Sequence, residues 1–115
     1  MKTASDVLSR EAAARLSDYR RAVRDALPGL EKIILFGSRA RGEARDDSDY
    51  DIAVVVRDLS DRRQVRRILS DLAYEHILSG FFIRPVPLPA GYLDRHNPRP
   101  TELAAEIARD GVEVE

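Results

Sequence analysis

The sequence predicts an α/β (α+β) fold, a small mixed β-sheet flanked by helices. Apolar residues recur every three or four positions in long segments, which is the period of an amphipathic helix. Short runs rich in β-branched residues alternate with these segments and indicate strands. The expected order is helix, strand, strand, helix, strand and helix, over 5–27, 30–36, 49–56, 60–79, 81–88 and 101–110. Such an order favours a mixed sheet with its helices on one side.

The first helix is expected to begin at Ser5 or Asp6, whose side chains suit an N-cap. It is expected to end before Pro28-Gly29, because proline and glycine rarely continue a helix. A β-branched strand follows directly and is broken by Gly37.

A short helical turn is expected next, from its N-cap Ser38 to Arg41. A polar loop over 42–48 then leads to the strand at 49–56. After two leading carboxylates, both faces of this strand become apolar. The strand is therefore expected in the interior of the sheet.

In the second half of the chain, a long helix is expected to begin at Ser60 and to end at Gly80. The strand that follows contains three prolines, which lack an N–H group and confine a strand to an edge. Thr101 is expected to open the last helix and Gly111 to cap its end. Residues 112–114 are expected to add a terminal strand.

The composition limits the classes of function. A chain of 115 residues, 43% of them hydrophobic, is expected to form a single domain over residues 1–115. Charged residues make up 34% but nearly cancel to a net charge of −1, which argues against nucleic acid or an anionic membrane as the partner. The absence of cysteine excludes thiol catalysis and thiolate metal sites. No segment approaches the roughly 20 apolar residues that cross a bilayer, and no signal sequence is visible, so a cytoplasmic location is expected.

The central segment carries the chemistry. Gly37-Ser38 ends one strand, and Asp49-x-Asp51 begins the next. A glycine lets the backbone approach phosphate oxygens closely, and N–H groups at a helix start bind anions. The two aspartates, two positions apart on a strand, point to one side, where carboxylates can hold Mg²⁺. The segment therefore predicts a site for a nucleoside triphosphate and its metal ions, as used for in-line attack at phosphorus.

Each half of this motif also has an ordinary structural explanation. A Gly-Ser turn after a strand is common, and so is Asp-x-Asp near a strand end. Burying two like charges so close together is costly, however, unless a cation compensates them. Both halves on one strand–turn–loop–strand frame are far more specific than either alone, and they favour the phosphate and metal site.

Gly37-Ser38, ten intervening residues and Asp49-x-Asp51 resemble the signature of the DNA polymerase beta-like nucleotidyltransferase superfamily. The Gly-Ser-Arg-Ala-Arg-Gly form and the small size resemble its minimal nucleotidyltransferase (MNT) domains, which are often antitoxins paired with a HEPN-type ribonuclease toxin. The resemblance implies the nucleotidyltransferase fold, ATP as substrate, Mg²⁺ as cofactor and transfer of AMP to a tyrosine of the toxin. It assigns nucleotide binding to Gly37, Ser38, Arg39 and Arg41, and metal binding and catalysis to Asp49 and Asp51.

The chain departs from this family where a third carboxylate is expected on a later strand. The matching segment, 80–88, contains no Asp or Glu, and Arg84 stands at or near the expected place. In two-metal sites of this family, the third carboxylate mainly serves the metal that activates the nucleophile. Its loss spares the nucleotide-bound metal and threatens the transfer step. Arg84 either substitutes for a metal's charge or is a plain surface arginine.

Two interpretations therefore stay open. The leading one is a Mg²⁺-dependent nucleotidyltransferase that adenylylates a partner protein, a HEPN-type toxin. The alternative is a catalytically degenerate module that binds nucleotide and neutralises a partner by binding it. Transfer to a small molecule or to RNA ranks last, because the chain is short for an added substrate domain.

Overall fold

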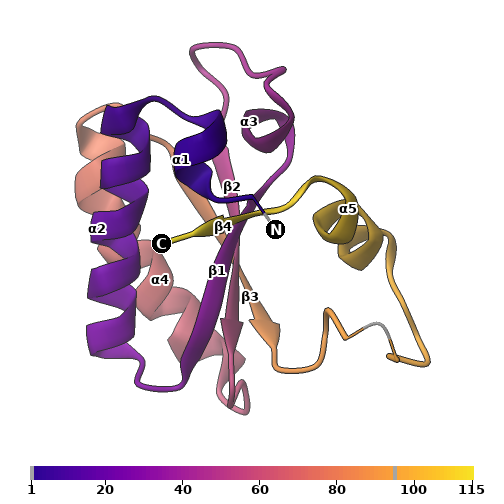
Figure 1. Ribbon diagram of the computed structural model, residues 1–115. Coiled ribbons are helices and arrows are strands. Elements are labelled where there is room, and N and C mark those ends of the chain that lie inside the picture. The colour runs from indigo at the N-terminus through magenta and orange to yellow at the C-terminus, as the bar shows by residue number, and fades with distance from the viewer. Residues whose placement is uncertain (1, 95) are drawn as a thin grey trace.

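Four strands form one mixed sheet with helices on both faces in the computed structural model, which describes residues 2–94 and 96–115 (Figure 1). The strands are β1 (Leu30–Phe36), β2 (Tyr50–Val56), β3 (Ile83–Pro89) and β4 (Val112–Val114). The helices are α1 (Ala4–Val7), α2 (Arg10–Ala26), α3 (Ser38–Arg41), α4 (Arg62–Leu78) and α5 (Glu102–Asp110). The strand order is β3-β2-β1-β4, with β1 antiparallel to β2 and β4, and with β2 parallel to β3.

The expected strands are confirmed to within two residues at their ends. β2 lies between β1 and β3, so its placement in the interior of the sheet is confirmed. β3 is an edge strand, where a missing proline N–H costs no ladder bond on the open side. The terminal strand at 112–114 is also confirmed, because β4 pairs with β1.

The expectation that the helices lie on one side of the sheet is wrong. α2 and α4 cover one face, and α5 covers the other (Figure 1). The core under α2 and α4 contains Leu35 and Ile52, whereas the core under α5 contains Ile34 and Ala53. Because alternate residues of β1 and β2 are apolar on both faces, each face needs a cover that removes it from water.

The expected first helix is two helices. α1 ends at Val7, its C-cap Leu8 has an extended backbone, and α2 begins after Ser9. The Ser9 hydroxyl accepts a hydrogen bond from the Ala12 N–H at 3.1 Å, so it caps the second helix. The first helix is capped by Thr3, and the expectation of Ser5 or Asp6 as N-cap is wrong. A serine side chain that bonds the backbone in this way favours a new helix start at Ser9 over a continuous helix.

The remaining helices begin close to the expected places. Asp61 caps α4 by accepting from the Gln64 N–H at 3.1 Å, one residue after the expected start at Ser60. Thr101 caps α5 as expected, and Gly111 follows its last turn. Among residues 2–94 and 96–115, no helix has the length and apolar character needed to cross a membrane.

Candidate functional site

The β1–β2 ladder brings the two halves of the motif together. Phe36, the last residue of β1, pairs with Asp51 near the start of β2, so the turn at Gly37 lies beside the aspartates. Gly37 has φ 76° and ψ −159°, a conformation open almost only to glycine. A Cβ on Gly37 would also lie 2.8 Å from Asp51 Oδ2. The turn therefore requires glycine both for its backbone and for the carboxylate packed against it.

The short helix α3 starts from this turn. The Gly37 carbonyl accepts hydrogen bonds from the Ala40 and Arg41 N–H groups, both at 3.1 Å. Gly37 is thus the N-cap and Ser38 the first helical residue, so the expectation of Ser38 as N-cap is wrong. The first N–H groups of α3 have no acceptor within the helix, which leaves them available to an anion.

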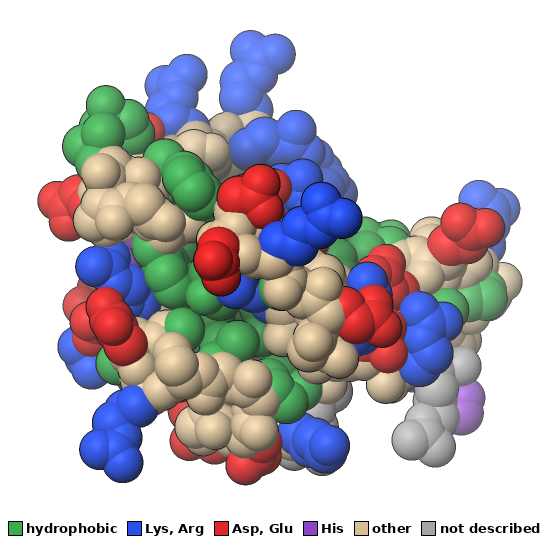
Figure 2. All heavy atoms as spheres, turned by 90° about the horizontal axis from the view of Figure 1, so that it is seen from above, with side chains coloured by type: hydrophobic (Ala, Val, Ile, Leu, Met, Phe, Trp, Pro, Cys, Tyr) green, Lys and Arg blue, Asp and Glu red, His purple; other side chains and the backbone are tan. Residues whose placement is uncertain are grey.

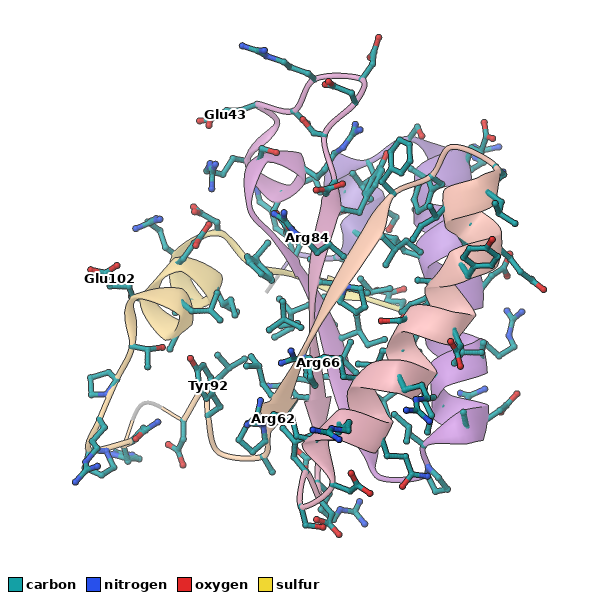
Figure 3. The ribbon with its side chains drawn as sticks, turned by 180° about the vertical axis from the view of Figure 1, so that it is seen from behind. Glu43, Arg62, Arg66, Arg84, Tyr92 and Glu102 are labelled. Atoms are coloured by element: carbon teal, nitrogen blue, oxygen red, sulfur yellow. The ribbon has the colours of Figure 1, made fainter. Side chains whose placement is uncertain are left out.

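Arg84 joins the two aspartates. It is the register partner of Asp51 in the parallel β2–β3 ladder, so the two side chains leave the sheet on the same face. Arg84 Nε donates to Asp51 Oδ1 at 2.6 Å, and Arg84 Nη1 lies 3.2 Å from Asp49 Oδ2. Because one guanidinium touches both carboxylates, Asp49 and Asp51 face the same space. Arg84 lies at the end of the sheet that carries α3 and the loop (Figure 3).

The three charged side chains of this cluster differ in their exposure to solvent. The side chain of Asp51 is 15% exposed, that of Asp49 is 42% exposed and that of Arg84 is 64% exposed. The hydrogen bond to Asp51 raises the pKa of Arg84 above its ordinary value, so the guanidinium stays charged. One positive charge offsets part of the two negative charges, and an additional cation would complete the compensation.

The donor set fits one divalent cation. Asp49 and Asp51 supply two carboxylates on one side. Mg²⁺ commonly binds one or two carboxylates together with substrate phosphates. No group of three or more His, Cys, Asp or Glu side chains placed to hold a metal occurs in the described part of the chain. A site with a third carboxylate is thus not built from these residues, and the register position that would supply it holds Arg84.

Arg39, predicted to bind the nucleotide, holds the loop that separates the two halves of the motif. Its guanidinium donates to the carbonyl of Ser48 at 2.9 Å and to that of Asp46 at 3.2 Å. It also lies 4.2 Å from the centre of the Tyr50 ring, a cation–π distance. In this arrangement Arg39 sets the approach of the chain to Asp49, and contact with a nucleotide remains a prediction.

Arg41, the other arginine predicted near the triphosphate, connects α3 to α5. Its guanidinium lies 3.1 Å from Glu43, 3.4 Å from Glu106 and 3.6 Å from Asp110. These carboxylates raise the pKa of Arg41, with the hydrogen bond to Glu43 as the largest cause. Its nucleotide contact also remains a prediction.

An aromatic pair borders the site on the side of α2. Tyr50 stacks on Phe81 with ring centroids 4.1 Å apart, and Arg15 lies 5.5 Å from the Phe81 ring. A hollow bordered by Ser9 and Ala12 opens beside these rings. Hydrophobic side chains are visible in the recessed centre of the face seen from above (Figure 2). The sequence did not predict this stack, because nothing local relates residues 50 and 81.

The family now follows from sequence comparison. The model of the family described as Polymerase beta, Nucleotidyltransferase matches residues 23–114, which include β1, the turn, the loop and β2. The chain belongs to this nucleotidyltransferase family. A comparison with curated proteins finds no match.

Solved structures share the nucleotidyltransferase fold. A chain of a toxin–antitoxin crystal structure with AMP-PNP is 25% identical with a TM-score of 0.62, over 86% of this chain and 72% of that one. An MntA–HepT toxin–antitoxin structure is 22% identical with a TM-score of 0.59, over 89% and 70%. A Shewanella oneidensis structure of a tri-AMPylated HEPN toxin with its MNT antitoxin is 22% identical with a TM-score of 0.58, over 90% and 71%.

Proposed function

We propose that this nucleotidyltransferase is an antitoxin that transfers AMP from ATP to a hydroxyl group of a HEPN-type toxin. The observation that carries the proposal is the contact between the Gly37 turn and Asp51, which places a backbone suited to phosphate beside two carboxylates suited to metal. The similarity to a toxin–antitoxin structure with AMP-PNP and to a complex with a tri-AMPylated toxin supports the choice of nucleotide and acceptor.

Each residue of the motif has a role in this proposal. Gly37 and Ser38 bind the β- and γ-phosphates through backbone N–H groups and the Ser38 hydroxyl. Asp49 and Asp51 would hold Mg²⁺, which when bound would supply positive charge next to the reacting phosphate. Arg39 keeps the loop in place, so that Asp49 stays beside Asp51.

The toxin's hydroxyl oxygen forms a bond to the α-phosphorus of ATP while the bond from that phosphorus to the α–β bridging oxygen breaks. Pyrophosphate leaves with the electron pair of that bond, and the hydroxyl proton passes to solvent. The Gly37 turn, together with a cation that Asp49 and Asp51 would hold, would orient the triphosphate for in-line attack.

The test is label transfer from α-³²P-ATP with Mg²⁺ to a co-expressed HEPN partner. The variant Asp49→Asn with Asp51→Asn is expected to abolish labelling, because amides do not supply the charge that Mg²⁺ needs. The matched control is Asp46→Asn with Asp47→Asn, which removes two exposed charges from the same loop and is expected to label normally. Undiminished labelling by the Asp49 and Asp51 variant would refute these roles.

A specific observation favours a second function. Arg84, in place of a third carboxylate, neutralises part of the pair and leaves the transfer step without one of the family's usual acids. The chain would then bind nucleotide and neutralise its partner by binding alone. Calorimetry with ATP and Mg²⁺ separates the two: binding without label transfer supports the second function, and transfer rejects it.

A further inference from the structure

Arg84 occupies a defined position between the two carboxylates of the motif. β3 carries it, and the parallel ladder sets it opposite Asp51. Its two contacts use one oxygen of each carboxylate, Oδ1 of Asp51 at 2.6 Å and Oδ2 of Asp49 at 3.2 Å. A side chain that merely projected into solvent would not be expected to direct two nitrogens at two separate acids. The guanidinium therefore acts on the pair as a bound cation would.

The second oxygen of Asp51 faces another direction. Oδ2 lies against the Gly37 turn, 2.8 Å from the position that a Cβ there would take. Asp51 thus divides its oxygens between two sides, with Arg84 on the side of β3 and the Gly37 turn on the side of β1. A cation that arrives with a triphosphate at the Gly37 turn can use the second oxygen while Arg84 keeps the first.

We propose that the guanidinium of Arg84 takes the place of a second metal ion beside Asp49 and Asp51, so that the chain binds one divalent cation with each nucleotide. The inference rests on the proposed function for the nucleotide itself. The guanidinium has donors and no acceptor, so it cannot ligate a metal. Its charge also repels any second cation placed on the β3 side of the carboxylates. The Arg84 guanidinium is thus the positive charge on the β3 side of Asp49 and Asp51, where the chain lacks the third carboxylate.

The test counts manganese ions. Mn²⁺ is titrated into the protein with saturating AMP-PNP, and bound ions are measured by electron paramagnetic resonance. The unmodified chain is expected to bind one Mn²⁺ per AMP-PNP. Arg84→Asp puts a carboxylate opposite Asp51 in the β2–β3 ladder, and this variant is expected to bind two Mn²⁺ ions per AMP-PNP. The control Arg67→Asp makes the same change of charge on the exposed surface of α4 and is expected to bind one.

A second arm without nucleotide measures competition directly. Arg84→Gln removes the charge and leaves a shorter, neutral side chain, and it is expected to bind Mn²⁺ at the aspartates about tenfold more tightly than the unmodified chain. Arg67→Gln is expected to leave that affinity unchanged. Circular dichroism of each variant checks that the fold is retained.

The outcomes separate the two proposals. Two Mn²⁺ ions per AMP-PNP in the unmodified chain, or equal Mn²⁺ affinity of the unmodified chain and Arg84→Gln, would overturn the inference and leave the proposed function standing. Failure to bind AMP-PNP would refute the proposed function, and the arm without nucleotide would still decide whether Arg84 competes with a cation. One ion in the unmodified chain and two in Arg84→Asp would support the inference.

Discussion

Replacement of Gly37 by alanine tests the turn that sets β1 against Asp51. The φ of 76° and ψ of −159° place this residue in a region where a side chain costs about 1–3 kcal/mol. The new Cβ would also stand 2.8 Å from Asp51 Oδ2, so Asp51 must leave its rotamer at a cost of about 0.5–1.5 kcal/mol. Together these two costs predict a loss of about 1.5–4.5 kcal/mol in the free energy of unfolding.

The assay is urea unfolding followed by far-UV circular dichroism, with Gly42→Ala as the matched control. Gly42 has φ 75° and ψ 19°, and in the described structure no atom lies within 4 Å of the Cβ that alanine would add. Only the left-handed backbone is then penalised, at about 1–2 kcal/mol. The reasoning is refuted if Gly37→Ala destabilises the chain no more than Gly42→Ala does.

Two further predictions concern a half-buried histidine and a buried tyrosine. Burial lowers the pKa of His76 below its ordinary 6.5, so the unfolded chain binds the proton first and stability should fall as the pH drops below that value. Urea unfolding from about pH 5 to pH 7.5 should show this loss, and His76→Gln should remove it; an unchanged pH dependence in that variant would contradict the assignment. Tyr19 donates to the Leu69 carbonyl at 2.7 Å inside the core, and Tyr19→Phe should lower the free energy of unfolding by about 1 kcal/mol. A phenylalanine variant as stable as the unmodified chain would show that this bond contributes nothing.

Strand positions were predictable because their signal is local. Alternating apolar residues mark a strand wherever it pairs, and β1 and β2 appear within one residue of the expected bounds. The prolines in β3 correctly predicted an edge strand, because no tertiary contact can restore a missing N–H group. The helix caps were less predictable. Several short polar residues near the N-terminus suit a cap, so the pattern alone did not separate Thr3, which caps α1, from the expected Ser5 or Asp6.

The cover of the second sheet face was not predictable from periodicity. The apolar periodicity of a helix predicts that one of its faces is buried, but it does not predict which face of the sheet that helix covers. α5 lies on the face opposite α2 and α4, so that Ile107 packs with Ile34 and Ala53. Because β2 was predicted to be apolar on both faces, both faces of the sheet had to be covered. That α5 is the helix that covers the second face depends on the path of the chain after β3.

By itself, the sequence determined that Gly37-Ser38 and Asp49-x-Asp51 follow one another on a strand–turn–loop–strand frame. It also determined that no acid stands on the later strand. Only the tertiary structure decided that Arg84 forms ion pairs with both aspartates. Its contact with Asp51 joins residues 33 positions apart, and it depends on the parallel register of β2 and β3, because a slip of one residue would send Arg84 to the opposite face.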